Sequence, residues 1–364
     1  MKSIAESKIY HSYLDGLRGI ATLMVVAVHA SQVVGNVRRG SFAFEWFGKY
    51  INEGARGVQL FFLLSAFTLF ASSHERFMTE LLPKRNFYIR RAFRIMPLWW
   101  LIILIFSLKD NWSFSQAMPS FFMYFGFIRF MPHSEVHPLG WTIFVEITFY
   151  ILLPLLFITI TNLRRSVIFL IAMTILARLW IKYAELLGVP ETQGFIKLFP
   201  LAQWYCFAGG ITLYFIHQTY GSDWIVGRAA RILEISIVGC FLIFFTKGHF
   251  WATFTLGLLF LACMSPKTIF GKIVRIKFLQ QFGICCYSIY LLHPVVLQYS
   301  EPLKKIIFNS LNIEQLCVDL KFCIWFPLVS VMCLILGLLI FYLVEKPSVN
   351  LGKKVIRLLE NRRF

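Results

Sequence analysis

Ten apolar runs, each about as long as a membrane-crossing helix, constrain this chain more than any other feature. A helix needs about 20 mostly apolar residues to cross the hydrocarbon core of a bilayer. Of the 364 residues, 58% are hydrophobic and only 15% are charged, whereas soluble domains have about 45–50% and about 25%. A soluble fold of this size cannot bury that excess of apolar side chains. The sequence therefore predicts an all-α, polytopic membrane protein.

The apolar runs define ten predicted spans and one shorter stretch. The spans lie at about 14–34, 57–74, 95–109, 140–161, 166–187, 198–217, 229–246, 250–265, 278–298 and 322–344. The stretch 117–130 is shorter and contains Arg129, so we interpret it as a re-entrant or interfacial half-span. No internal repeat and no extra soluble domain are visible. Residues 1–364 are therefore expected to form a single transmembrane domain.

The distribution of basic residues predicts the orientation of these spans. The chain has 36 Lys and Arg against 18 Asp and Glu, a formal net charge of +18. If the N-terminus is inside and ten spans alternate, 23 of the 36 basic residues lie on the inner side, 12 lie outside and one, Arg178, lies within a span. Basic residues favour the cytoplasmic side of short loops. The charge therefore predicts that both termini are inside, and it gives no reason to expect a nucleic-acid partner.

Ionisable residues inside the first predicted span are candidates for function, because burying them in hydrocarbon is costly. Arg18 and His29 are eleven residues apart, which places them on one face of a helix and about 16 Å apart along its axis. Asp15 precedes them in the same segment. Arg18 is expected at the inner boundary and His29 slightly beyond mid-membrane. A snorkelling arginine and a structurally satisfied histidine are the alternative interpretation.

An arginine-rich segment precedes the third predicted span. Arg90, Arg91 and Arg94 occupy neighbouring positions on a helical turn. Arginine binds phosphate through two parallel hydrogen bonds and keeps its charge. The density of the cluster favours a site for a phosphate-bearing ligand, although a simple positive-inside anchor also needs basic residues.

Four polar side chains, His29 among them, are predicted at similar depths in the middle-to-outer half of the membrane. Glu146 lies about 8 Å below the outer interface, which Trp141 marks. His293, Ser65 and His29 fall at comparable depths on other spans. Each could be structural, and Ser65 could bond its own helix backbone. Together they indicate an inner basic site that the first helix joins to a deeper acid–base site.

Five segments of the chain resemble membrane-bound acyltransferase family 3, the O-acetyltransferases of bacterial surface glycans. They are Tyr13 to His29 with its Arg-x10-His spacing, Gly57 to Phe67, Tyr88 to Trp99, Trp141 to Pro154, and Tyr287 to Pro294. A weaker sixth segment, Tyr342 to Pro347, ends the last predicted span. The order and spacing of the segments make the resemblance specific.

The resemblance implies transfer of an acyl group, usually acetyl, from cytosolic acyl-CoA to a sugar hydroxyl. The acceptor would be a lipid-linked or surface glycan, such as O-antigen of lipopolysaccharide or an exopolysaccharide, at a bacterial inner (plasma) membrane. Acetyl-CoA would be bound by Arg18, Arg90, Arg91 and Arg94, with no metal. His29 would be the general base or a transient acyl carrier, and Glu146 would orient its imidazole. Asp15, Ser65, Trp141, Tyr150, Tyr287 and His293 would support the acceptor site.

Two other functions fit the same residues. Intramembrane His and Glu with a half-span also suit a proton-coupled transporter or a glycan exporter. A non-catalytic sensor or assembly subunit is the third possibility. A transporter has no evident need for three arginines at the end of one helix. A sensor has no evident need for a set of buried ionisable residues. An enzyme is therefore the favoured prediction.

Overall fold

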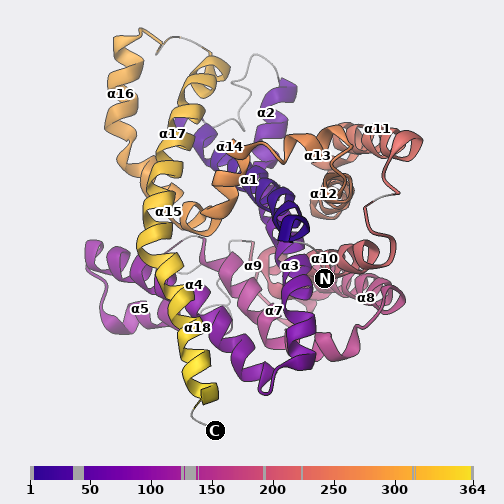
Figure 1. Ribbon diagram of the computed structural model, residues 1–364. Helices are drawn as coiled ribbons and strands as arrows, with labels where there is room; N and C mark the ends of the chain where they lie inside the picture. Colours follow the sequence, from indigo (N-terminus) through magenta and orange to yellow (C-terminus); the bar gives the residue numbers. More distant parts are fainter. Residues whose placement is uncertain are drawn as a thin grey trace. The chain divides into compact units, whose positions relative to one another are not determined.

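The computed structural model describes residues 4–35, 45–123, 127, 137, 139–191, 194–222, 224–313, 315 and 317–361. Every regular element in this described part of the chain is helical (Figure 1). Seven of its helices are long and apolar enough to cross a membrane, or eight if a bent pair is one span. The predicted class, an all-α multi-pass membrane protein, is confirmed.

All ten predicted spans coincide with helices. In chain order these are α1 (Ile4–Gly35), α3 (Gly57–Thr79), α4 (Pro83–Lys109), α7 (Gly140–Thr159), α8 (Leu163–Tyr183), α10 (Pro200–Tyr220), α11 (Gly227–Phe244), α12 (His249–Met264), α14 (Lys277–Ile284) with α15 (Cys286–Tyr299), and α17 (Val318–Ile340). Shorter elements connect or extend them: α2 (Glu45–Asn52), η2 (Glu53–Arg56), α5 (Phe114–Phe121), η3 (Glu185–Leu187), α9 (Phe195–Leu198), η4 (Phe245–Lys247), α13 (Ile269–Ile273), α16 (Glu301–Ser310), the π-helical η5 (Phe341–Glu345) and α18 (Lys346–Asn361).

Three predicted spans differ in detail from the helices. Helix α12 has only 16 residues, and α10 is long enough but insufficiently apolar to count as a span by composition. The predicted span 278–298 is broken, because α14 and α15 meet at an angle of 82°. The half-span 117–130 begins in the eight-residue helix α5, and most of its second half lies outside the described residues.

Helix α4 begins twelve residues before the predicted span 95–109. Pro83 occupies the first turn, where a helix tolerates a residue without a backbone N–H. Lys and Arg are good helix formers, so the basic segment continues the apolar helix instead of preceding it as a loop. Arg90, Arg91 and Arg94 are therefore fixed on the same rigid element as the apolar span.

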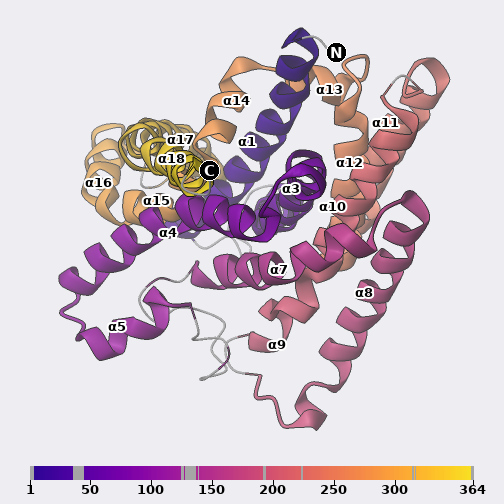
Figure 2. The same ribbon diagram turned by 60° about the horizontal axis from the view of Figure 1, so that its bottom comes forward.

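By its internal contacts the chain divides into two compact units, and a single transmembrane domain stays a prediction. Unit 1 comprises Met1–Leu64 and Tyr220–Phe341. Its core is a cluster of α1, α15 and α17 side chains that includes Val26, Ile289 and the fully buried Trp325. Helices α1 and α14 lie side by side in this unit (Figure 2). Unit 1 therefore supports the helix that carries Arg18 and His29.

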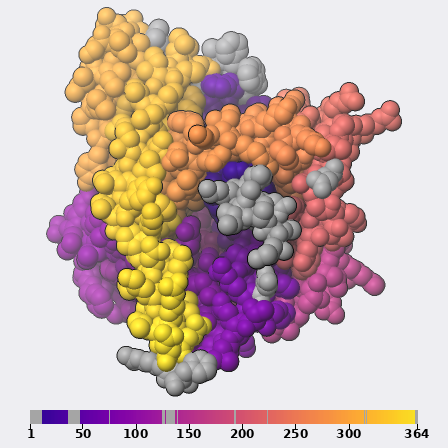
Figure 3. All heavy atoms as spheres, viewed as in Figure 1, coloured from indigo at the N-terminus to yellow at the C-terminus, as the bar shows by residue number. Residues whose placement is uncertain are grey.

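Unit 2 comprises Ser65–Thr219 and Tyr342–Phe364 and has an aromatic core. Phe157 on α7 is completely buried, and its ring centroid lies 5.0 Å from Phe70, 5.3 Å from Phe77 and 5.9 Å from Phe87. These contacts hold α3 and α4 against α7. Helix α18 packs along α4 and is visible on the molecular face shown in Figure 3.

Candidate functional site

Glycines set the position of the Asp15–Arg18 segment in unit 1. A Cβ atom at Gly16 would lie 1.7 Å from the carbonyl oxygen of Val274, and one at Gly19 would lie 2.0 Å from that of Leu279. A Cβ at Gly283 on α14 would in turn lie 1.8 Å from the Asp15 carbonyl oxygen. Only glycine permits such a close approach of two backbones. The segment is thus held directly against the α13–α14 region.

Arg18 is already paired within its own helix. Its Nη1 lies 2.7 Å from Oδ1 of Asp15, and both side chains are about one-quarter exposed, at 25% and 24%. The unbroken α1 carries Arg18 and His29 together, as the spacing predicts. Arg18 is therefore accessible, and a carboxylate holds its guanidinium.

Arg275 fixes the start of the same helix segment from outside the spans. Its guanidinium lies 5.3 Å from the ring centroid of Tyr13, and its Nη atoms donate to the carbonyl oxygens of Cys263 and Met264 at 3.1 and 3.2 Å. These are the last carbonyls of α12, which have no partner inside the helix. Burial lowers the pKa of Arg275, but an arginine remains protonated at any physiological pH.

His29 lies beside two residues of unit 1 that bear on its chemistry. Its Nδ1 is 3.2 Å from Oε1 of Gln32, one turn later on α1. Its ring centroid is 5.1 Å from that of His293 on α15, which is fully buried. The His293 ring lies 5.9 Å from Tyr290, and Tyr290 lies 6.0 Å from Phe61. Histidine and aromatic rings therefore line one side of this site, and Tyr287 stands on the first turn of the same α15.

Glu146 lies at the centre of a separate cluster in unit 2. Its Oε1 accepts hydrogen bonds from Ser65 Oγ at 2.6 Å and from Tyr150 Oη at 2.5 Å. Ser65 comes from α3, whereas Tyr150 lies one turn after Glu146 on α7. Trp141 lies at the start of α7, about one and a half turns before Glu146. The predicted convergence of Ser65 and Glu146 is therefore present, and Tyr150 joins them.

Arg91 turns towards this cluster. Its guanidinium carbon lies 5.9 Å from the Tyr150 ring centroid, and its Nε is buried without a hydrogen-bond partner among the described residues. A nearby cation compensates the charge of a partly buried carboxylate such as Glu146. Arg91 therefore belongs to the polar cluster of α7.

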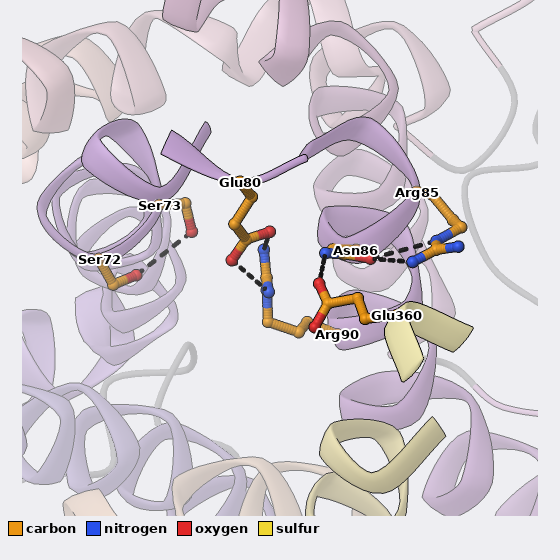
Figure 4. A network of polar contacts seen from close by, with 7 residues as sticks. All are labelled: Ser72, Ser73, Glu80, Arg85, Asn86, Arg90 and Glu360. Atoms are coloured by element: carbon orange, nitrogen blue, oxygen red, sulfur yellow. Dashed lines mark hydrogen bonds and ion pairs between the residues drawn. The ribbon is translucent and has the colours of Figure 1, made fainter. Parts of the chain in front are cut away.

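The other two arginines of the predicted cluster point elsewhere. Arg90 forms two hydrogen bonds with the carboxylate of Glu80, at 2.9 and 3.0 Å (Figure 4). Arg94 Nη1 lies 3.1 Å from Oε1 of Glu345, whose side chain is only 1% exposed. The side chain of Arg94 is 38% exposed, compared with 17% for Arg90. The three guanidiniums thus have three different partners, and Arg94 is more open to a ligand than Arg90.

The α18 helix is tied to α4 at three levels. Glu345 reaches Arg94 at its start, a Cβ at Gly352 would lie 2.8 Å from Phe93, and Glu360 accepts from Asn86 Nδ2 at 2.8 Å. Asn86 also accepts from Arg85, as Figure 4 shows. The arginine-bearing face of α4 is therefore bordered by the C-terminal helix.

The sequence predicted the depth of the site residues in the membrane but not several of their hydrogen-bond and ion-pair partners. Gln32, three residues after His29, could have been found from helical spacing alone. Arg90 pairs with Glu80 and Arg94 pairs with Glu345. Nothing in the local sequence pattern predicts either ion pair. The predicted orientation of His29 by Glu146 links the two units and stays a prediction. Among the described residues, no group of three or more His, Cys, Asp or Glu could hold a metal ion.

Comparison of the sequence with known proteins identifies the family of this chain. The profile of an acyltransferase domain matches residues 11–342, and the chain therefore belongs to acyltransferase family 3. A peptidoglycan O-acetyltransferase, OatA of Listeria monocytogenes, is 23% identical over 346 residues, covering 82% of this chain and 51% of that protein. The chain thus spans about half the length of this curated relative. No solved structure matches.

Proposed function

We propose that this protein transfers an acetyl group from acetyl-CoA to a hydroxyl group of a lipid-linked or surface glycan. The observation that supports this most is the acyltransferase domain match over residues 11–342, which includes every proposed catalytic and donor-binding residue. The relative OatA is a peptidoglycan O-acetyltransferase, which supports a glycan acceptor. The helices of the described part support a place in a membrane, and we propose the bacterial plasma membrane.

His29 is the proposed general base. Its imidazole takes the proton of the acceptor hydroxyl while the hydroxyl oxygen attacks the thioester carbonyl carbon. The new C–O ester bond forms, the C–S bond breaks, and the imidazolium returns the proton to the departing CoA thiolate. Imidazole suits both steps because its ordinary pKa lies near neutrality.

Glu146 is the proposed second catalytic group, and its surroundings support that role. Two hydroxyl donors converge on one of its oxygens, and the guanidinium of Arg91 lies beside the donor Tyr150. Such an arrangement holds a carboxylate in a fixed position inside a membrane domain. Its predicted task is to stabilise the protonated form of the base, as the carboxylate of a catalytic triad does.

Arg94 and Arg18 are the proposed contacts to the phosphates of the donor. Both are held by a carboxylate through Nη1 and remain partly exposed, at 38% and 25%. Arginine can exchange a carboxylate for a phosphate without losing charge or bidentate geometry. Arg90 has both ends of its guanidinium engaged by Glu80, which favours a supporting role.

Purified protein in proteoliposomes, supplied with radiolabelled acetyl-CoA and a glycan extract of the host envelope, tests the proposal. Wild type is expected to transfer label to the glycan, and His29→Ala is expected to reduce transfer to background. His249→Ala is the matched control, because His249 also faces a glutamine side chain at 3.2 Å in unit 1. Transfer by His29→Ala at the wild-type rate would refute the base assignment. A wild type that takes up glycan or protons but transfers no label would favour a transporter.

A further inference from the structure

The contact between His29 and Gln32 bears on which ring nitrogen of His29 carries a proton. Gln32 presents its amide oxygen to Nδ1 of His29 at 3.2 Å, and an amide oxygen can only accept a hydrogen bond. With the amide of Gln32 in this orientation, Nδ1 is the donor. In a neutral imidazole a proton on Nδ1 leaves the lone pair on Nε2.

Helix geometry supports this contact. Residues three apart lie on the same face of a helix, so Gln32 reaches His29 across one turn without distortion. The last turn of α1 is also held from outside, because Lys304 Nζ donates to the Val33 carbonyl oxygen at 2.9 Å. Gly35 ends the helix against Val318 of α17. The backbone that carries both side chains is therefore anchored.

We infer that Gln32 is a positioning residue that holds His29 in the Nδ1–H tautomer and so leaves Nε2 to accept the proton of the acceptor hydroxyl. In a catalytic triad a carboxylate has this task. Here a neutral amide from the same helix performs it, which fixes the tautomer without adding a negative charge beside the base. The inference deepens the proposed function and rests on His29 being the base.

Other charged groups near this end of α1 act equally on every Gln32 variant. On elements packed against α1 they include His293 on α15, Glu301 and Lys304 on α16, Asp319 on α17, Glu53 and Arg56 on η2, and Lys49 on α2. None of them is altered when Gln32 is replaced. A difference between Gln32 variants therefore reports the group at position 32 itself.

Two substitutions of similar size distinguish the effect of a hydrogen-bond acceptor at position 32 from the effect of a negative charge there. Gln32→Glu keeps an acceptor oxygen within reach of Nδ1 and adds a negative charge, whereas Gln32→Leu removes the acceptor. Gln32 is exposed, so neither change opens a cavity or leaves a buried polar group unpaired. Both variants are therefore expected to fold, which near-ultraviolet circular dichroism and the melting temperature check.

The first measurement is the tautomer itself, read by nitrogen-15 NMR of histidine-labelled protein in nanodiscs. The His29 signals are assigned by comparison with His29→Asn, and the His249 signals serve as the internal reference. Wild type and Gln32→Glu are expected to show Nδ1 protonated, and Gln32→Leu a redistribution towards Nε2–H. An Nε2–H tautomer in wild type, or an unchanged tautomer in Gln32→Leu, would overturn the inference.

The second measurement is the pH profile of acetyl transfer. Gln32→Leu is expected to lower kcat about tenfold with KM unchanged, by analogy with other groups that orient a histidine. Gln32→Glu is expected to retain the wild-type maximum, with the half-maximal pH raised by about one unit because a carboxylate favours the imidazolium. Equal profiles for all three proteins would overturn the positioning role. Failure of wild type to transfer acetyl would refute the proposed function alone, because the NMR result does not depend on activity.

Discussion

The hydroxyl of Tyr150 offers a direct test of the cluster around Glu146. Tyr150→Phe removes one oxygen and keeps the ring beside which Arg91 lies, so it deletes the interactions of the hydroxyl with Glu146 and Arg91 and leaves the ring in place. The deleted bond runs from Oη to Glu146 Oε1 over 2.5 Å, and Tyr150 is only 6% exposed. Water cannot easily replace the lost donor.

Two known ranges of hydrogen-bond energy could apply to the loss of this hydrogen bond. Hydrogen bonds between uncharged side chains in membrane proteins contribute about 0.6 kcal/mol on average. A hydrogen bond to a charged group contributes about 1.5–3 kcal/mol. Glu146 retains the Ser65 donor, so the lower part of the second range applies. We expect Tyr150→Phe to reduce the free energy of unfolding by about 1.5–2 kcal/mol.

Tyr88→Phe is the matched control. Tyr88 Oη also donates to α7, but to the Ile151 carbonyl oxygen at 3.1 Å, and Tyr88 is 41% exposed. Its loss is expected to be about 0.6 kcal/mol or less. The assay is reversible unfolding in mixed micelles, followed by tryptophan fluorescence, for both variants under identical conditions.

The comparison of the two variants decides the outcome. If Tyr150→Phe costs no more than Tyr88→Phe, Glu146 does not act as a charged acceptor and the proposed role of this carboxylate is refuted. The double variant Ser65→Ala/Tyr150→Phe sharpens the test. Both hydroxyls share one oxygen, so removal of both should cost more than the sum of the single losses.

Two further predictions concern packing and donor binding. Gly16→Ala should destabilise the protein by about 1–3 kcal/mol or more, because the new Cβ meets the Val274 carbonyl oxygen. Gly239→Ala on α11 meets no atom within 4 Å and should stabilise the protein by about 0.5–1 kcal/mol in the same unfolding assay. Arg94→Gln should raise KM for acetyl-CoA several-fold and also lower the melting temperature, because the buried Glu345 loses its cation, whereas Arg90→Gln should leave KM for acetyl-CoA nearly unchanged. Equal effects of the two arginine substitutions on KM would instead support one phosphate site shared by Arg90 and Arg94.

The positions of the membrane helices were predictable from hydropathy, but their ends and bends were not. The apolar run at 278–298 contains no proline before Pro294, so it predicts one straight span. The structure breaks it at Cys285, between α14 and α15. The contact of Gly283 with the Asp15 backbone holds α14 against α1 there. Such a tertiary contact between residues far apart in the chain leaves no trace in local hydropathy.

In the candidate site, too, local features were predictable from the sequence and tertiary contacts were not. Partners within one helix follow from spacing, as for His29 with Gln32 and Glu146 with Tyr150. Partners from distant segments do not: Ser65 and Glu146 are 81 residues apart, and Asn86 and Glu360 are 274 apart. Similar membrane depth brought Ser65 and Glu146 into one prediction. Depth alone could not show that they share a hydrogen bond.

The paired arginines change how the excess positive charge is understood. The sequence suggested a bare cluster of guanidiniums, but Arg18, Arg90 and Arg94 each lie against a carboxylate, of Asp15, Glu80 and Glu345. A carboxylate that holds an arginine restricts its rotamers before a ligand arrives, so less side-chain entropy is lost on binding. It also opposes an anionic ligand by its own charge. Donor affinity should therefore depend on how readily each carboxylate releases its arginine when a phosphate binds. Glu80 holds Arg90 through two nitrogens, so we expect Arg90 to exchange its carboxylate for a phosphate poorly.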